Sequence, residues 1–328
     1  MKTVIAELAA APGPDELSEA AVAQRATNVL RPLGSFERLD RVAAWLAGWQ
    51  GTDLPEVERP GLLLAAADHG VVARGVSAYP PEVTTAMIDA IRAGAATSTV
   101  LAGHLGASMR LLDVGVGAAT GDITSEDAMT TDRFLAAFAE GREAVSTMDV
   151  DLLLLGEMGI GNTTTAAAVS MALFGGAAED WVGPGSGIEE ERRADKADVV
   201  RRAVERVGPA DPFEVLRRLG GLELAAIAGA VVEARMRSLP VLLVGFVTTA
   251  AVAPIEVAMP GALDHTYAAH VSSEPGHRLL LERLGKAPLL DLELRLGEGS
   301  GALLALPIVR AAAVAVTDVA TFEEWGLR

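Results

Sequence analysis

Residues 151–169 read DLLLLGEMGIGNTTTAAAV. The near-continuous apolar run at 152–155 is typical of a strand that is buried on both faces of a parallel sheet. The glycines after it predict a tight turn, and Asn162 and Thr163 are good N-cap residues for a helix over the alanines. A strand, a glycine turn and a helix in this order indicate an α/β fold.

The same rhythm extends along the chain from about residue 61. Further apolar runs end in Gly or Asp and are followed by helical patterns, at residues 62–67, 110–114, 241–244, 268–271 and 289–292. We therefore predict an α/β fold with a Rossmann-like, mostly parallel sheet flanked by helices. Ligands bind beyond the carboxyl ends of the strands in such sheets. The loops expected to gather there are 68–70, 113–117, 156–162 and 296–301.

The two ends of the chain lack this rhythm and read as helices. Asp15 is a plausible N-cap for a first helix, and a second is predicted over about 35–49. Near the other end, the pattern predicts a helix over 302–316 and a short acidic helix over 321–327. The expected division is into a small helical domain, residues 1–55 with 303–328, and a large α/β substrate-binding domain, residues 56–302.

Composition excludes several classes of protein. Half of the 328 residues are apolar but only 4% are aromatic, so the core must be built from Ala, Val and Leu. A net charge of −17 without a dense Lys and Arg cluster argues against a nucleic acid partner. The absence of cysteine excludes disulfides, thiolate zinc sites and a Cys nucleophile.

The N-terminal residues do not resemble a signal peptide. The apolar windows at 241–255 and 302–316 are too short or too interrupted for a membrane span of about 20 residues. We therefore expect a cytoplasmic protein that does not bind a membrane.

Two glycine-rich loops indicate an anion site. The first is 156–162, and the second is VGPGSG at 182–187, with Lys196 on the predicted helix after it. Loop N–H groups and the positive end of a helix suit a phosphate, and Lys196 is able to add a point charge. Taken alone, the first loop is more often an ordinary strand-to-helix turn, and a lone lysine is more often solvated. The first loop is not a Walker A motif, and the absence of GxGxxG after the first strand disfavours a dinucleotide-dependent oxidoreductase.

Three further features carry side chains suited to chemistry. Glu298 lies between two glycines in LGEGSG, where no neighbouring side chain shields its carboxylate, although a turn or helix-capping acid is the alternative. His69 follows a predicted strand, but the other histidines show no spacing typical of metal ligands, so we expect no metal. Residues 77–80, SAYP, indicate a semi-apolar pocket wall, and a buried turn fits them as well.

Five motifs in this order resemble the nicotinate-nucleotide–dimethylbenzimidazole phosphoribosyltransferase family of cobalamin lower-ligand biosynthesis. They are GEMGIGNTT, VGPGSG with its downstream lysine, SSEPGH at 272–277, RLGEGSGA and TFEEWG. The resemblance runs from about residue 12 to residue 326. It implies a large Rossmann-like domain with a small helical domain from both termini, a homodimer, and no cofactor. It also implies transfer of ribose 5-phosphate from nicotinate mononucleotide to 5,6-dimethylbenzimidazole, which releases nicotinate.

The resemblance also implies roles for single residues. Glu298 is expected to be the general base, and Glu157 to lie in the active site. The expected phosphate and nucleotide region comprises Gly159, Ile160, Gly161, Asn162, Thr163, Gly183, Gly185, Ser186, Gly187 and Lys196. The expected pocket for the aromatic base comprises Ser77, Tyr79, Pro80, Met87 and Leu296.

Three positions depart from the family pattern. Val244 stands where members commonly have Asp, Pro184 where many have Arg, and Ala67 where many have Gly. The loss of a charge at Val244 leaves both glutamates and Lys196 in place. It keeps a second hypothesis open, in which the protein is a non-catalytic or altered-specificity binder of a nucleotide or an aromatic base.

Overall fold

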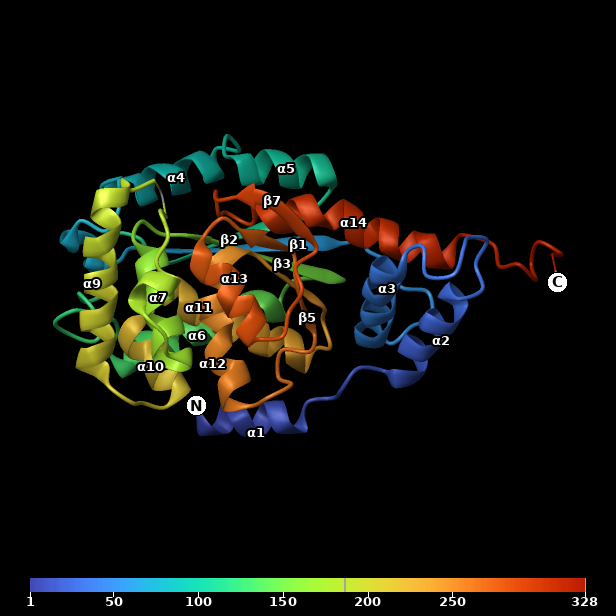
Figure 1. Ribbon diagram of the computed structural model, residues 1–328, viewed down its shortest axis with the longest axis horizontal. Coiled ribbons are helices and arrows are strands. Elements are labelled where there is room, and N and C mark those ends of the chain that lie inside the picture. Colours follow the sequence, from blue (N-terminus) through green and yellow to red (C-terminus); the bar gives the residue numbers. More distant parts are fainter. Residues whose placement is uncertain (186, 328) are drawn as a thin grey trace.

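Figure 1 presents the computed structural model, which describes residues 1–185 and 187–327. Its main sheet has five parallel strands in the order β2-β1-β3-β4-β5. The predicted parallel α/β fold is confirmed. The strands are β1 (Pro60–Ala67), β2 (Ser108–Gly115), β3 (Leu152–Met158), β4 (Val241–Leu243) and β5 (Thr266–Ala268).

Helices connect the strands and extend beyond them at both ends of the chain. A short 3₁₀ helix, η1 (Gly70–Arg74), follows β1. The α-helices are α1 (Lys2–Ala10), α2 (Glu16–Ala26), α3 (Glu37–Gln50), α4 (Glu82–Arg92), α5 (Thr97–Leu105), α6 (Thr131–Ser146), α7 (Asn162–Phe174), α8 (Ala178–Trp181), α9 (Glu190–Val207), α10 (Pro212–Leu219), α11 (Leu222–Met236), α12 (Gly245–Ala258), α13 (Pro275–Arg283) and α14 (Ser300–Thr317).

Both faces of the main sheet are covered, which explains the uninterrupted apolar strands. All of β1 is buried, and its side chains alternate between two cores. Leu63 and Ala65 pack on one face with α6, α7, α11 and α12. Leu62 and Leu64 pack on the other with α3, α4, α5 and α14, which Figure 1 shows in part above the sheet.

A second sheet lies beside the first. β6 (His270–Ser272) pairs in parallel with β7 (Leu290–Leu294) only. The prediction of a single strand over 268–271 is therefore wrong. Ala269 still donates its N–H to Leu243 of β4, at 2.9 Å, but the chain then leaves the main sheet, so one apolar run serves two sheets.

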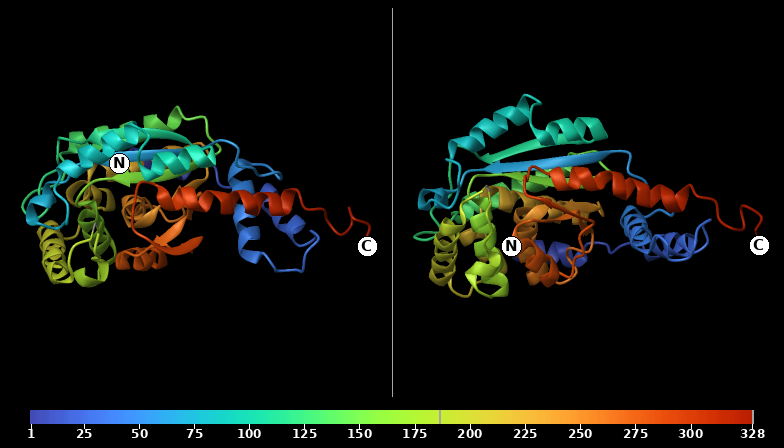
Figure 2. Two further views of the ribbon diagram at one scale, coloured as in Figure 1. Left: turned by 90° about the horizontal axis from the view of Figure 1, so that it is seen from above. Right: turned by 45° about the horizontal axis from the view of Figure 1, so that its top comes forward.

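The helices α2 and α3 pack with the end of α14 beyond the edge of the sheet (Figures 1 and 2). The N-cap predicted at Asp15 is confirmed, because its carboxylate accepts the Ser18 N–H at 2.9 Å. By contrast, α1 packs on α11, and its Val4 and Leu8 belong to the core of the large sheet. The division of the chain at residues 55 and 302 stays a prediction.

The short helix predicted over 321–327 is wrong. This segment forms turns after an antiparallel bridge between Val29 and Thr321. Glu324 pairs with Arg25 at 3.0 Å and accepts the Thr321 N–H at 2.7 Å. These contacts tie the segment to α2 and stabilise a turn in place of a helix.

Within the described ranges, α14 is the one helix that is long and apolar enough to cross a membrane. It lies against α3, α5 and β3, and Leu303, Leu306 and Val309 on it are fully buried. Its apolar composition is therefore that of a helix packed inside a protein core.

Candidate active site

The strand order creates a crevice at the carboxyl end of the sheet. β1 and β3 are neighbours in the sheet. The chain continues from β1 to β2 on one side of this pair and from β3 to β4 on the other side, so the loops after β1 and β3 diverge. Ligands bind at such points in α/β sheets. Asp68 and His69 follow β1 here, and Glu157 lies near the end of β3, opposite Ala65 of β1.

The β7–α14 loop, residues 295–299, brings Glu298 to this crevice from the second sheet. The Glu298 N–H donates to the Glu157 carbonyl oxygen at 3.2 Å. Gly297, Glu298 and Gly299 all have positive φ, of 84°, 58° and 81°. A Cβ on Gly297 would lie 2.7 Å from Glu157 Oε1, and the positive φ there also favours glycine.

The Glu298 carboxylate is held by a buried donor. Ser98 Oγ donates to Glu298 Oε2 at 3.1 Å, and Glu298 is only 3% exposed. Ser98 lies in the first turn of α5, where the helix dipole also favours a negative charge. A fixed carboxylate in this setting is suited to accept a proton from a ligand.

Glu157 is the second carboxylate of the crevice. Burial raises the pKa of Glu157 to about 7; the hydrogen bond from Asn162 opposes this rise, while the neighbouring carboxylates of Glu223 and Glu298 add to it. At neutral pH this group therefore exchanges a proton readily. Its charge responds to any cation that enters the crevice.

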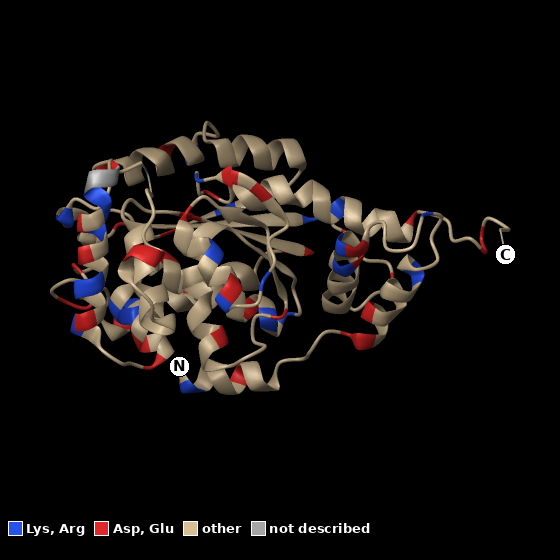
Figure 3. Ribbon diagram, in the orientation of Figure 1, with Lys and Arg blue, Asp and Glu red and all other residues tan. Residues whose placement is uncertain are grey.

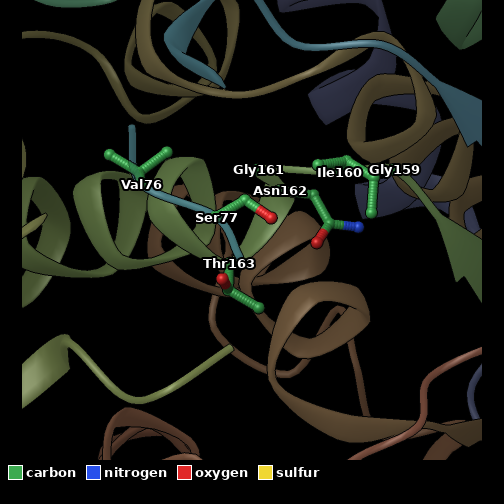
Figure 4. Close-up of a pocket in the computed structure, with 7 residues that line it drawn as sticks. All are labelled: Val76, Ser77, Gly159, Ile160, Gly161, Asn162 and Thr163. Carbon is green, nitrogen blue, oxygen red and sulfur yellow. The ribbon is translucent and has the colours of Figure 1, made fainter. Parts of the chain in front are cut away.

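The β3–α7 turn, residues 159–163, forms a small pocket of about 40 Å³ with Val76 and Ser77. Figure 4 shows the Ser77 hydroxyl and the Asn162 amide facing the same space. The helix N-cap is Gly161, so the expectation of a cap at Asn162 or Thr163 is wrong by one or two residues. The side-chain amide of Asn162 donates instead to Glu157.

Lys196 lies under this turn and is not a solvated surface residue. It is 1% exposed, and its Nζ donates to Thr163 Oγ1 at 2.9 Å and to the Gly183 carbonyl at 3.2 Å. Burial lowers the pKa of Lys196 to about 8, although Glu274 opposes this shift. The lysine thus joins the β3–α7 turn to the 183–187 loop.

The 183–187 loop is held from below by Glu274. The Gly185 N–H donates to Glu274 Oε1 at 2.7 Å, and Glu274 is 5% exposed. Sequence reasoning gave Glu274 no role, although it lies within the SSEPGH motif. Gly187 is exposed beside Arg295, and Ser186 lies outside the described residues.

A family model described as phosphoribosyltransferase matches residues 11–327 of the chain. The nicotinate-nucleotide–dimethylbenzimidazole phosphoribosyltransferase of Brucella anthropi is 48% identical over 320 residues, covering 96% of this chain and 94% of its own. The chain belongs to this family.

Two solved structures agree with this assignment. The crystal structure of CobT from Thermus thermophilus has a TM-score of 0.91 at 42% identity, over 94% of this chain and 98% of that one. A second crystal structure from the same organism, of nicotinate-nucleotide–dimethylbenzimidazole phosphoribosyltransferase, has a TM-score of 0.90 at 41% identity, over 96% and 99%.

The residues that the family resemblance assigns to the aromatic base are spread over three segments. Ser77 lines the pocket of the β3–α7 turn. Tyr79 and Leu296 are each 52% exposed, Pro80 is exposed, and Met87 is partly buried on α4. Their convergence around a bound base stays a prediction.

Val244, which replaces the common Asp of the family, is part of the core. It is 2% exposed, packs with Leu242 and Leu306, and donates its N–H to Thr248 Oγ1 at 2.9 Å. The position therefore contributes packing at the start of α12 and no charge.

The site also contains polar residues that sequence reasoning missed or gave no role. Ser98 lies in a helix without any motif, and Glu223 opens α11 in an ordinary apolar sequence. Glu223 accepts a hydrogen bond from His69, a residue that the sequence had raised only as a metal candidate. In the part of the chain that the structure describes, no group of His, Asp and Glu is arranged to hold a metal.

Proposed function

We propose that this protein transfers the phosphoribosyl group of nicotinate mononucleotide to 5,6-dimethylbenzimidazole, giving α-ribazole 5′-phosphate and nicotinate. The observation that carries the proposal is the junction of Glu298 and Glu157 at the switch point of the sheet. The shared name of the relatives supports the same reaction.

The leaving group sets what the site must supply. The bond between ribose C1′ and the pyridinium nitrogen breaks, and its electron pair returns to that nitrogen. Nicotinate then leaves with a neutral ring, so no general acid is needed. This fits a crevice whose prominent side chains are two carboxylates.

The incoming base sets the role of Glu298. A benzimidazole nitrogen attacks C1′ from the face opposite to the leaving group, which inverts the anomeric carbon to the α configuration. The proton on the other ring nitrogen passes to the Glu298 carboxylate, so the product ring is neutral. A positioned base of this kind contributes about 10²–10⁴ in rate.

The remaining groups bind the nucleotide and stabilise its charge. The β3–α7 turn, the helix start of α7 and Lys196 suit the phosphate. Positive charge develops on the ribose in the transition state, and an ionised Glu157 stabilises it. Holding both rings on opposite faces of one ribose supplies the rest of the acceleration.

The reaction is tested by mixing the purified protein with both substrates and measuring nicotinate release. Binding of both compounds without release would support the alternative, a non-catalytic or altered-specificity binder. A panel of other benzimidazoles, purines and phenols then identifies the preferred base. We further propose that the enzyme works as a homodimer in the cytoplasm.

Glu298→Gln tests the base. We expect nucleotide binding to persist and turnover to fall by about 10² or more, because the amide does not accept the ring proton. Glu293→Gln is the matched control, since Glu293 is an exposed acid that shares the positive φ of Glu298. Wild-type turnover in the Glu298 variant contradicts the assignment.

A further inference from the structure

A buried histidine–glutamate pair lies directly beneath the β3–α7 turn. His69 Nε2 and Glu223 Oε1 are 2.6 Å apart, and neither side chain is exposed. His69 follows β1, and Glu223 lies in the first turn of α11. No step of the proposed reaction uses either residue.

Two glycines on different segments make room for this pair. A Cβ on Gly159 would lie 3.1 Å from His69 Nε2 and 3.2 Å from Glu223 Oε1. A Cβ on Gly221 would overlap the His69 ring and lie 2.5 Å from Glu223 Oε2. The first glycine of the β3–α7 turn therefore lies against the pair, although the closest atom to its Cβ position is the Ala67 carbonyl oxygen, at 2.7 Å.

Folding stability does not account for the pair. Burying two ionisable side chains is costly, and well-packed apolar residues in the place of such a pair are often neutral or stabilising. Each partner also keeps one buried atom that has no hydrogen bond among the described residues, namely His69 Nδ1 and Glu223 Oε2. Such a costly arrangement beside a reactive crevice indicates a functional role.

The pair also acts on the charge of Glu157. The charged groups that face Glu157 are Glu223 on α11, Glu298 on the β7–α14 loop and His69 after β1. Besides burial, the Glu223 carboxylate raises the pKa of Glu157, whereas His69 lowers it. The two members of the pair thus shift the pKa of Glu157 in opposite directions.

We propose that His69 and Glu223 are a positioning pair of the active site, which supports the β3–α7 turn and holds a carboxylate behind Glu157. The pair touches no reacting atom. It keeps the pKa of Glu157 close to neutral, so that the positive charge of the bound nucleotide decides whether Glu157 is ionised. This inference rests on the proposed phosphoribosyl transfer.

The test uses two variants with opposite expected effects. Glu223→Gln keeps the side-chain shape and the acceptor for His69 but removes the charge, so the acidic limb of kcat/KM for nicotinate mononucleotide shifts to lower pH by about one unit. His69→Gln removes the group that lowers the pKa of Glu157, so the limb shifts to higher pH. Val231→Ala, a core change on the same helix, lowers the Tm and leaves the limb in place.

The readouts separate the possible outcomes. If neither variant moves the limb and both only lose Tm as Val231→Ala does, the pair is structural and the proposal is overturned. If Glu223→Gln does not fold, the upward shift in His69→Gln decides by itself. Calorimetric binding of nicotinate mononucleotide across the same pH range shows the same two shifts without turnover. A wild-type protein that binds but releases no nicotinate therefore overturns the proposed reaction and not the pair.

Discussion

Lys196 is almost completely buried. Its side chain therefore loses its proton in a pH range that ordinary buffers cover. Because burial lowers the pKa of Lys196 to about 8, it loses its proton as the pH rises through that value. We expect the affinity for nicotinate mononucleotide to fall above pH 8, by up to about tenfold per pH unit. Calorimetry between pH 7 and 9.5 measures this.

Lys286 provides a matched control for Lys196. Burial also lowers the pKa of Lys286 to about 8, but its Nζ donates to the carbonyls of Leu263 and Thr266, in a different segment. Lys286→Met should keep the inflection near pH 8, and Lys196→Ala should bind weakly without it. An inflection that survives in Lys196→Ala assigns the titration to another group.

Single residues differ in how well the sequence predicts them. Glu298 is recognisable as a candidate because a glycine stands on each side of it in the sequence. Lys196 is a candidate only through the glycine loop before it and the family resemblance, because nothing in its spacing shows that its side of α9 faces Thr163, a residue 33 positions earlier. Ser98 is further still from Glu298 along the chain, and only the fold brings them together.

The helices α6 and α11 cross at their glycines. A Cβ on Gly141 would overlap the Ala226 carbonyl, and a Cβ on Gly229 would overlap the Phe138 carbonyl. Backbone atoms cannot relieve such an overlap by changing a side-chain rotamer, so the two helices would have to move apart. Gly141→Ala should therefore destabilise the fold by about 3 kcal/mol or more. Thermal unfolding measures this loss.

Gly103 on α5 is the control for this substitution. No atom lies within 4 Å of the place that its Cβ would take, so Gly103→Ala should stabilise the helix by roughly 0.5–1 kcal/mol. A Gly141→Ala variant with unchanged Tm would show that the two helices separate more easily than their packing indicates.

Elements are predicted well where one apolar run belongs to one strand. The runs at 62–67 and 152–155 lie within β1 and β3, because both faces of those strands are buried. The run at 268–271 has the same composition but is divided between two sheets. Periodicity does not reveal a change of hydrogen-bond partner, which depends on tertiary contacts.

The whole molecule is acidic, and in Figure 3 acidic and basic segments are interspersed along the helices. The helical group beyond the sheet exposes large apolar side chains, including Leu17 at 84% and Leu33 at 79%. These side chains are available to the interface of the homodimer proposed above. We expect light scattering to give the mass of two chains at micromolar concentration, and the mass of one chain would contradict the homodimer.

Glu298 occupies a left-handed backbone position that costs a residue with a side chain about 1–2 kcal/mol and that glycine or asparagine occupies more easily. The proposed role as general base gives a reason for a glutamate at this position, whereas the exposed Glu293 shares the backbone conformation without such a role. A descendant that no longer needs the reaction is under no pressure to keep it, and drift toward glycine or asparagine at this position would leave the loop intact. On the proposed role of Glu298, we expect the identity of this one residue to distinguish working members of the family from silent ones.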